Sequence, residues 1–476
     1  MVAKEKSVMP FVHTAIMLVF MFGFGYLPTI GSITALGMQT LGIFIGVIYG
    51  WSTLGMIWPS LLGLAALSLM PGSGAIAIFK TGFGDRVTVA IFFFLLFGEL
   101  INKVGLSKFI ADWCVSRKFV QGKPYAILAM FCVAGAFVSA FVNCFAGIIL
   151  IWGVFDNFCK EVGLKPGDKF AALSLVALIF ITCAAGDILP FMGLSILAVG
   201  LQQSILGIGM PYITFTIVQI FMVLLAAALY FLVMKFIFRP DTSKVKAFAP
   251  SQEKQVMTGD QKFVFGLLIG LLVTLFLPGL LPADWSITVA LKALDLAGVL
   301  AIVFVIYYVV NLYKGTAISF GSLAKEMNWS LILMFATVAP LAAAVNNADS
   351  GILAYAGQLL QGLVGGMNPY LFTIIIILIA SIMTQFCNNV AILLMVMPIM
   401  LTFAAQLGAN PIILTMLAAF NLNIAFCTPA ASGPAAMMFS NREWIGTGTS
   451  YVNGIIIFAI TMLATVAGMF LAIVLV

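Results

Sequence analysis

The sequence predicts an all-α polytopic membrane protein with about eleven transmembrane helices and two re-entrant hairpins, arranged as two repeats of inverted topology. The first observation is the composition: 63% of the 476 residues are hydrophobic and 8% are charged, whereas a soluble domain carries about 25% charged residues. The second is the length of the apolar runs, which repeatedly reach the roughly 20 residues that a helix needs to cross a bilayer. The third is a polar motif that occurs twice, each time inside such a run.

The N-terminal segment comprises residues 1–85 and has a full-length first span directly after Lys4 and Lys6, so we expect no cleavable signal peptide. Helices are favoured over barrel strands because membrane strands alternate polar and apolar residues in segments of about 10 residues. The predicted spans of this segment lie at residues 11–30, 33–49 and 53–70.

The first repeat is predicted to comprise residues 86–238 and begins with a span at residues 86–103. Residues 105–118 are short and amphipathic, with charges at both ends, so we expect a helix that lies along the membrane surface. After a hairpin, residues 169–207 form a span that is broken at Ala184–Pro190, and residues 211–238 form the next span.

The hairpin of the first repeat is predicted at residues 123–160. A single helix over this apolar stretch would be about 54 Å long, far more than the roughly 30 Å of the hydrocarbon core. Two full crossings would need a charged or proline-containing turn, but the polar break comes near the centre, at Ser139–Asn143. We therefore expect a re-entrant hairpin whose tip reaches the middle of the bilayer.

The second half repeats this order. A hydrophilic linker at residues 239–262 separates the halves, and further spans occupy residues 263–327. The second repeat is predicted at residues 328–476 and has its hairpin at 368–407 and its broken helix at 411–441. The remaining predicted spans lie at residues 262–281, 294–313, 329–347 and 449–475, with a short stretch at 351–363 in the place of the surface helix.

Two polar islands relate the repeats. A hydroxyl, a Phe and an Asn recur at a constant offset of 245 residues: Ser139, Phe141 and Asn143 against Thr384, Phe386 and Asn388. Polar islands repeated at bilayer depth are typical of transporter sites that are built from two structural repeats. A single Asn of this kind more often makes a helix-packing hydrogen bond, but the repeated spacing favours a site.

The distribution of positive charge predicts the orientation. With the N-terminus in the cytoplasm and eleven spans, 19 of the 22 Lys and Arg residues fall on the cytoplasmic side, and Lys80, Arg86 and Lys292 fall outside. Cytoplasmic loops carry the excess of Lys and Arg. We therefore expect a multi-pass protein of the plasma (inner) membrane with an extracytoplasmic C-terminus and inverted halves.

The islands and breaks predict two sites for Na⁺. Broken helices offer free carbonyls to a cation and N-terminal dipole ends to an anion. The first predicted cage is Ser139 and Asn143 with the carbonyls of Ala185 and Gly186. The second is predicted from Thr384, Asn388 and Asn389 with the carbonyls near Pro429 and Ala430. No Lys or Arg lies in either island, so an anionic substrate would need co-bound cations, and this predicts symport with Na⁺.

Asp187 is the one ionisable residue in the first break, and an intramembrane carboxylate indicates function by default. It is a candidate for coupling, either as a cation ligand or as a proton carrier, and a role in capping the second half-helix is equally compatible. The alternative function is therefore a cation/proton antiporter, or a proton-coupled anion carrier, that uses Asp187.

Other classes of function are disfavoured. The chain has one His, and its seven Cys are scattered without a CxxC pair, so neither a metal centre nor a catalytic Cys–His pair is indicated. We expect a protein that is not an enzyme, has no organic cofactor and binds no nucleic acid. A channel is disfavoured by the two broken repeats.

At these residues the chain resembles the divalent anion–sodium symporter family, which carries dicarboxylates, citrate and sulfate. Where that family has Ser-Asn-Thr at each hairpin tip, this chain has Asn143-Cys144-Phe145 and Asn388-Asn389-Val390. The resemblance implies a scaffold that includes residues 1–85, a moving transport part, elevator-type alternating access, a homodimer and a small di- or tricarboxylate as substrate. It implies substrate contacts at Asn143, Cys144, Asn388, Asn389, Val390, Thr428 and Pro429.

Overall fold

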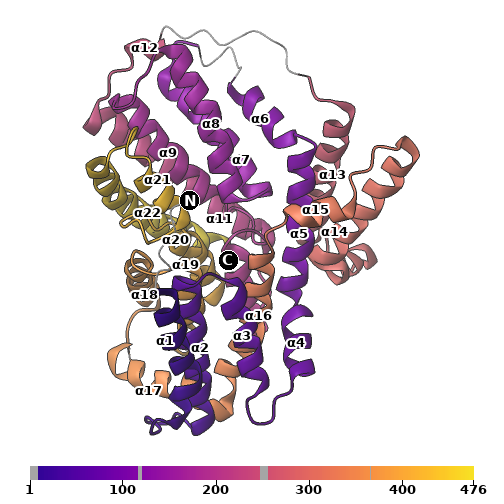
Figure 1. The fold of residues 1–476 in the computed structure, drawn as a ribbon, viewed down its shortest axis with the longest axis vertical. Helices are drawn as coiled ribbons and strands as arrows, with labels where there is room; N and C mark the ends of the chain where they lie inside the picture. The colour runs from indigo at the N-terminus through magenta and orange to yellow at the C-terminus, as the bar shows by residue number, and fades with distance from the viewer. Residues whose placement is uncertain (1–8, 116–120, 247–255, 365) are drawn as a thin grey trace, which may run out of the picture.

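The computed structural model describes residues 9–115, 121–246, 256–364 and 366–476, and within these ranges it has helices and no β-strand (Figure 1). Eight of the described helices are long and apolar enough to cross a membrane. The number becomes nine if α5 (Arg86–Lys103) and α6 (Leu106–Val115), which meet at 61°, count as one bent span. The prediction of an all-α polytopic membrane protein is confirmed.

Four helices precede α5. α1 (Met9–Gly23), α2 (Ala35–Thr53) and α3 (Ile57–Ser68) lie in the predicted spans, although the first helix ends early in a 3₁₀ turn ahead of Pro28. α4 (Ala75–Phe83) lies between two predicted spans, where no helix is predicted. Both α3 and α4 pack against α16 (Trp329–Asn346).

The predicted surface helix at residues 105–118 is α6, and its last three predicted residues lie outside the described ranges. The first hairpin is α7 (Pro124–Phe141) and α8 (Cys144–Val162), which pack against each other. The first broken helix is α9 (Lys169–Ala185) and α10 (Ser195–Leu206). α11 (Tyr212–Leu232) continues into a π-helical turn, Val233–Phe238.

The linker contains one described turn of helix, α12 (Ser243–Lys246). Lys244 lies 2.9 Å from Asp168, which precedes α9. The backbone N–H of Lys165 and the Lys244 ammonium hold the pKa of the Asp168 carboxyl below its ordinary value. This ion pair connects the linker to the segment that precedes α9 in the first repeat.

Two long helices follow the linker, α13 (Gly259–Phe276) and α14 (Ser286–Lys314). The span predicted at residues 294–313 begins earlier than expected, because helical structure starts at Ser286 and is interrupted at Asp295, whose φ is 52°. Arg86, at the start of α5, binds both carboxylate oxygens of Asp295. This tertiary pairing accompanies a positive φ at a non-glycine residue, a conformation that is rare outside glycine.

Eight described α-helices follow α14. After α15 (Phe320–Glu326) and α16 comes α17 (Ile352–Val364), in the place of the short stretch. The remaining helices are the hairpin α18 (Pro369–Thr384) and α19 (Asn389–Leu407), the broken helix α20 (Pro411–Asn423) and α21 (Gly433–Ser440), and the last helix α22 (Thr447–Leu475).

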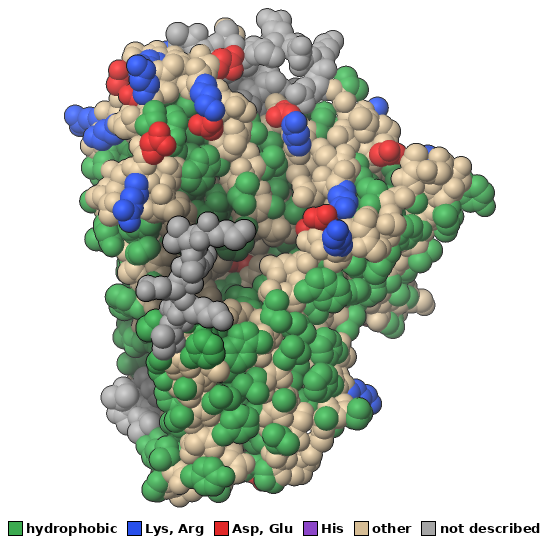
Figure 2. Space-filling model, in the orientation of Figure 1, with side chains coloured by type: hydrophobic (Ala, Val, Ile, Leu, Met, Phe, Trp, Pro, Cys, Tyr) green, Lys and Arg blue, Asp and Glu red, His purple; other side chains and the backbone are tan. Residues whose placement is uncertain are grey.

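Figure 1 places α1–α4 and α17 toward one end of the long axis and α8, α9 and α12 toward the other. Figure 2 shows Lys and Arg side chains gathered toward the latter end, above a broad hydrophobic surface. Among the described residues, every ion pair joins segments that the predicted topology places on the same side of the membrane. These pairs are Arg86–Asp295, Lys103–Glu326, Lys160–Asp156 and Lys244–Asp168.

The seam between α4 and α16 depends on Gly82, and we expect Gly82→Ala to lower the free energy of unfolding by about 1–3 kcal/mol. A Cβ at Gly82 would lie 2.1 Å from the Ala336 carbonyl oxygen, so the helices must separate. Gly153 in α8 is the matched control, because a Cβ there meets nothing within 4 Å. Thermal unfolding of the purified protein should show a lower midpoint for Gly82→Ala alone; equal midpoints would contradict this packing.

Candidate functional site

The two hairpin tips are built alike. α7 ends at Phe141, and Asn143 is the N-cap of α8, with its Oδ1 accepting a hydrogen bond from the Ala146 N–H at 2.7 Å. α18 ends at Thr384, and Asn388 is the N-cap of α19, with its Oδ1 accepting from the N–H groups of residues 390 and 391. The two Asn residues of the repeated motif thus begin equivalent helices.

The repeated hydroxyls are buried and unsatisfied. Ser139 is 1% exposed and Thr384 is 0% exposed, and neither side-chain oxygen has a hydrogen-bond partner within the described parts of the chain. A helical hydroxyl ordinarily bonds to the carbonyl four residues back, as Thr373 does to Pro369. The described residues contain 17 buried side-chain atoms of this kind, so the lack of a partner does not by itself indicate a ligand; these two hydroxyls differ in occupying equivalent positions of the two repeats. A bound cation is one group that could satisfy both oxygens.

The first hydroxyl faces the first break. A Cβ at Gly186 would lie 3.0 Å from the Ser139 oxygen, so this hydroxyl is next to the end of α9. Thr182, one turn earlier in α9, also has a buried side-chain oxygen without a partner within the described ranges. A Cβ at Gly135, one turn before Ser139 in α7, would lie 2.2 Å from the Thr182 oxygen. Both unsatisfied hydroxyls therefore lie along the contact between α7 and α9.

Asp187 caps the second half-helix of this break. Its Oδ1 accepts hydrogen bonds from the N–H groups of Leu194 at 2.6 Å and Ser195 at 3.1 Å, at the start of α10. The Ser195 hydroxyl donates back to the Asp187 carbonyl at 2.9 Å. The second carboxyl oxygen, Oδ2, is buried and has no hydrogen-bond partner in the described part of the chain. A carboxyl group therefore occupies the positive end of α10.

The second break is held by Gln385, which sequence analysis did not single out. Its Oε1 accepts hydrogen bonds from the N–H groups of Phe426 and Cys427, both at 3.0 Å. Its carbonyl accepts from the Thr428 hydroxyl at 2.6 Å. The sequence did contain a signal for this role, because the Gln385 side-chain amide lies within the second polar island. The hairpin tip and the unwound segment are thus joined by three hydrogen bonds.

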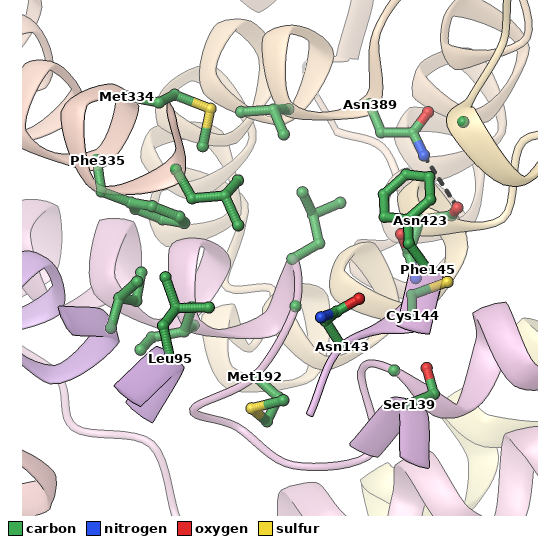
Figure 3. Close-up of a pocket in the computed structure, with 18 of the residues that line it drawn as sticks. Leu95, Ser139, Asn143, Cys144, Phe145, Met192, Met334, Phe335, Asn389 and Asn423 are labelled. Carbon is green, nitrogen blue, oxygen red and sulfur yellow. Dashed lines mark hydrogen bonds between the residues drawn. The ribbon is translucent and has the colours of Figure 1, made fainter. Parts of the chain in front are cut away.

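The two breaks meet through Asn423, a second residue that sequence analysis missed. Its amide donates to the Cys183 carbonyl in α9 at 3.2 Å, and its own carbonyl accepts from the Asn389 amide at 2.9 Å (Figure 3). Its signal in the sequence was the pair of amides, Asn421 and Asn423, near the end of an otherwise apolar helix. The C-terminal ends of α9 and α20 therefore lie together, and their carbonyl ends carry partial negative charge.

A cavity of about 260 Å³ lies between these tips and breaks on one side and α5 and α16 on the other. Of the predicted site residues, seven line it: Ser139, Asn143, Cys144, Gly186, Asn388, Asn389 and Val390.

The remaining predicted residues lie away from the cavity wall. Ala185, Asp187 and Thr384 are buried and are not among the residues that line it, and Thr428 is partly buried. Pro429 and Ala430 are exposed, and Ser432–Pro434 form the wall of the second break in their place.

Half-length helices that meet around a central cavity, inside a polytopic helical protein, define a membrane transporter. The chain belongs to the citrate transporter family (CitMHS), whose profile matches residues 41–419. The resemblance to carriers of this type is confirmed, and family membership makes the chain a transporter and not an enzyme.

Individual relatives agree with this assignment. The chain is 24% identical over 372 residues to the sodium-dependent dicarboxylate transporter SdcS of Staphylococcus saprophyticus, covering 74% of this chain and 70% of the relative. It is 27% identical over 159 residues to SdcS of Staphylococcus aureus, covering 33% and 30%. The crystal structure of the YdaH transporter of Alcanivorax borkumensis has the same fold, with a TM-score of 0.55 and 14% identity over 98% of this chain and 97% of that one.

Proposed function

We propose that this transporter carries a small carboxylate together with Na⁺. The observation that carries the proposal is the pair of unsatisfied hydroxyls, Ser139 and Thr384, at equivalent positions of the two repeats. Both relatives named above are sodium-dependent dicarboxylate transporters. Dicarboxylates and citrate are therefore the first substrates to test.

The donor set of the first Na⁺ site is the Ser139 and Thr182 hydroxyls with the carbonyls of Ala185 and Gly186, and Asp187 supplies negative charge nearby. Hydroxyls and unwound carbonyls at the C-terminal end of a half-helix suit a cation. Asn143 contributes by fixing the tip, because its Oδ1 already caps α8.

The second Na⁺ site is proposed around Thr384 and Asn389, whose Oδ1 is also buried without a partner in the described ranges. Asn388 fixes this tip in the same way as Asn143 fixes the first. The exposed Ala430 carbonyl is a weaker candidate than the carbonyls at the end of α20, because α20 ends next to Asn389.

The proposed movement is of elevator type. The helices α7–α11 contact α18–α22, for example α10 with α19 and α11 with α22, and together they hold both tips and both breaks. We call these helices the mobile part. The frame is α1–α5 with α13–α17, joined through contacts such as α3 with α16 and α5 with α14. The cavity lies between the two, so displacement of the mobile part would carry the site across the membrane.

We also propose a homodimer in the plasma (inner) membrane, with a cytoplasmic N-terminus and an extracytoplasmic C-terminus. The excess of positive charge in the predicted cytoplasmic segments supports the orientation. The dimer is proposed from the family resemblance.

One observation favours the second candidate, a proton-coupled carrier or antiporter that uses Asp187. Its Oδ2 is buried and has no partner within the described ranges, and it could take up a proton. The other oxygen caps α10, a role that Asn can retain. Proton movement that is lost in Asp187→Asn, with no Na⁺ dependence in the parent protein, would establish this alternative.

The experiment for the proposed function is uptake of labelled succinate, malate, citrate, sulfate and hexanoate by proteoliposomes. An inward Na⁺ gradient should drive accumulation of at least one carboxylate by about tenfold or more over an equal K⁺ gradient. Protein-free liposomes correct for passive entry of the free acid. Equal uptake under both gradients would contradict coupling to Na⁺.

A further inference from the structure

We infer that the preferred substrate is an amphipathic monocarboxylate, with one carboxylate and an apolar body, and not a di- or tricarboxylate. The inference rests on the proposed Na⁺-coupled function and narrows its substrate class. Three features of the cavity carry it: the lining, the helix N-termini and the charge balance.

The lining is apolar toward the frame and polar toward the breaks. Figure 3 shows Leu95, Met334 and Phe335 on one side of the cavity, with Asn143 and Asn389 on the other. Among the described residues, no Lys, Arg or His lines the cavity. A second carboxylate at the apolar side would lose its water without gaining a cation or a hydrogen-bond donor.

The four helix N-termini that face the cavity already carry protein oxygens. Asn143 caps α8, Asn388 caps α19, Ser432 caps α21, and the Asp187 carboxyl caps α10. Each N-terminus would otherwise attract an anion. What the two Asn caps leave free is their NH₂ groups, because their Oδ1 atoms face their own helices. Each NH₂ group has two N–H donors, and one donor from each Asn suits the two oxygens of a single carboxylate.

The net charge of the loaded site also favours a substrate with one carboxylate. If the two proposed Na⁺ ions are bound and the buried Asp187 is ionised, the ions bring two positive charges and Asp187 brings one negative charge. One substrate carboxylate makes the loaded site neutral, whereas a dicarboxylate leaves one uncompensated negative charge at bilayer depth. Unpaired charge in that environment is strongly disfavoured.

The test compares hexanoate with adipate, which have the same carbon chain but one and two carboxylates. Thermal unfolding of the purified full chain is followed over a series of ligand concentrations, in Na⁺ and in K⁺, and citrate is included. Ligand binding to the folded state raises the midpoint in proportion to RT ln(1 + [L]/Kd). We expect hexanoate to bind in Na⁺ at least about tenfold more tightly than adipate or citrate, and more weakly in K⁺.

The outcomes separate the two proposals. If adipate or citrate binds in Na⁺ as tightly as hexanoate, the inference is overturned and the proposed function stands. If hexanoate binds with equal affinity in Na⁺ and in K⁺, bound Na⁺ does not compensate the substrate charge. That result overturns both the charge argument of the inference and the proposed coupling of transport to Na⁺. If no carboxylate stabilises the protein and none is driven by a Na⁺ gradient, the proposed function fails, and the inference fails with it.

Two variants test the cause of the selectivity. Asp187→Asn keeps an oxygen cap for α10 but removes the charge, so the preference for hexanoate over adipate should fall by about tenfold or more. Leu95→Arg adds a cation to the apolar wall and should strengthen adipate binding by a similar factor, relative to Leu95→Gln as the uncharged control. Unchanged preference in a folded Leu95→Arg protein would contradict the charge argument.

Discussion

Replacing Ser139 by Ala and Thr384 by Val together should abolish the response of this transporter to Na⁺. Each change removes a buried oxygen that lacks a hydrogen-bond partner in the described parts of the chain, and neither removes a hydrogen bond that the fold uses. Each single variant should lower the apparent Na⁺ affinity by about tenfold or more, since one ligand of a small hard cation is lost. The measurement is a Na⁺ titration of thermal stability, followed by Na⁺-driven uptake.

The matched control is Thr373→Val together with Thr402→Val in the second hairpin. Those hydroxyls donate to the carbonyls of Pro369 at 2.9 Å and Pro398 at 2.8 Å, so they are satisfied without a cation. This control should lose a little stability and keep its Na⁺ affinity. If the Ser139/Thr384 variant keeps the wild-type Na⁺ titration, the two islands are not Na⁺ sites.

A disulfide between Val87→Cys and Gly200→Cys should stop transport completely and reversibly. A Cβ at residue 200 would lie 3.5 Å from the Cβ of Val87, within the range of about 3.5–4.5 Å for disulfides. Val87 lies in α5 of the frame and Gly200 in α10 of the mobile part. Oxidation should therefore fix the two parts together, and reductant should restore uptake. The exposed Cys387 is replaced by Ser beforehand to avoid side reactions.

The control disulfide joins Val47→Cys and Gly63→Cys, two positions inside the frame. Its Cβ atoms would lie 3.9 Å apart, and the residue types are the same. Oxidation of this pair should leave uptake unchanged. Full transport by the oxidised 87–200 pair, with the disulfide verified by mass, would show that α5 and α10 need not separate and would refute an elevator movement between these parts.

The long elements could be predicted from sequence because their cause is local. The second hairpin, predicted at residues 368–407, is observed as Pro369–Thr384 and Asn389–Leu407. A run too long for one crossing, with a polar break at its centre, has few structural solutions in a bilayer. The N-cap positions of Asn143 and Asn388 were not predicted, although Asn favours helix starts; both side chains were expected to act as ligands of Na⁺ and substrate.

The tertiary features could not be predicted in this way. Asp295 interrupts a helix because Arg86, more than 200 residues earlier in the chain, holds it. Gln385 and Asn423 form hydrogen bonds with backbone groups of other elements, and an amide in an apolar run does not indicate its partner. The sequence placed a carboxylate in the first break, but only the structure shows that Asp187 already occupies the N-terminus of α10.

The most direct test of the account is the effect of substrate on the entry of ²²Na⁺ into proteoliposomes. Coupling is reciprocal, so a carboxylate that Na⁺ drives must in turn drive Na⁺. We predict that external hexanoate accelerates ²²Na⁺ entry into wild-type proteoliposomes and has no effect in the Ser139→Ala/Thr384→Val protein. Entry of ²²Na⁺ that is the same with and without any carboxylate on the uptake panel would contradict the assignment of these hydroxyls to a Na⁺-coupled transport site.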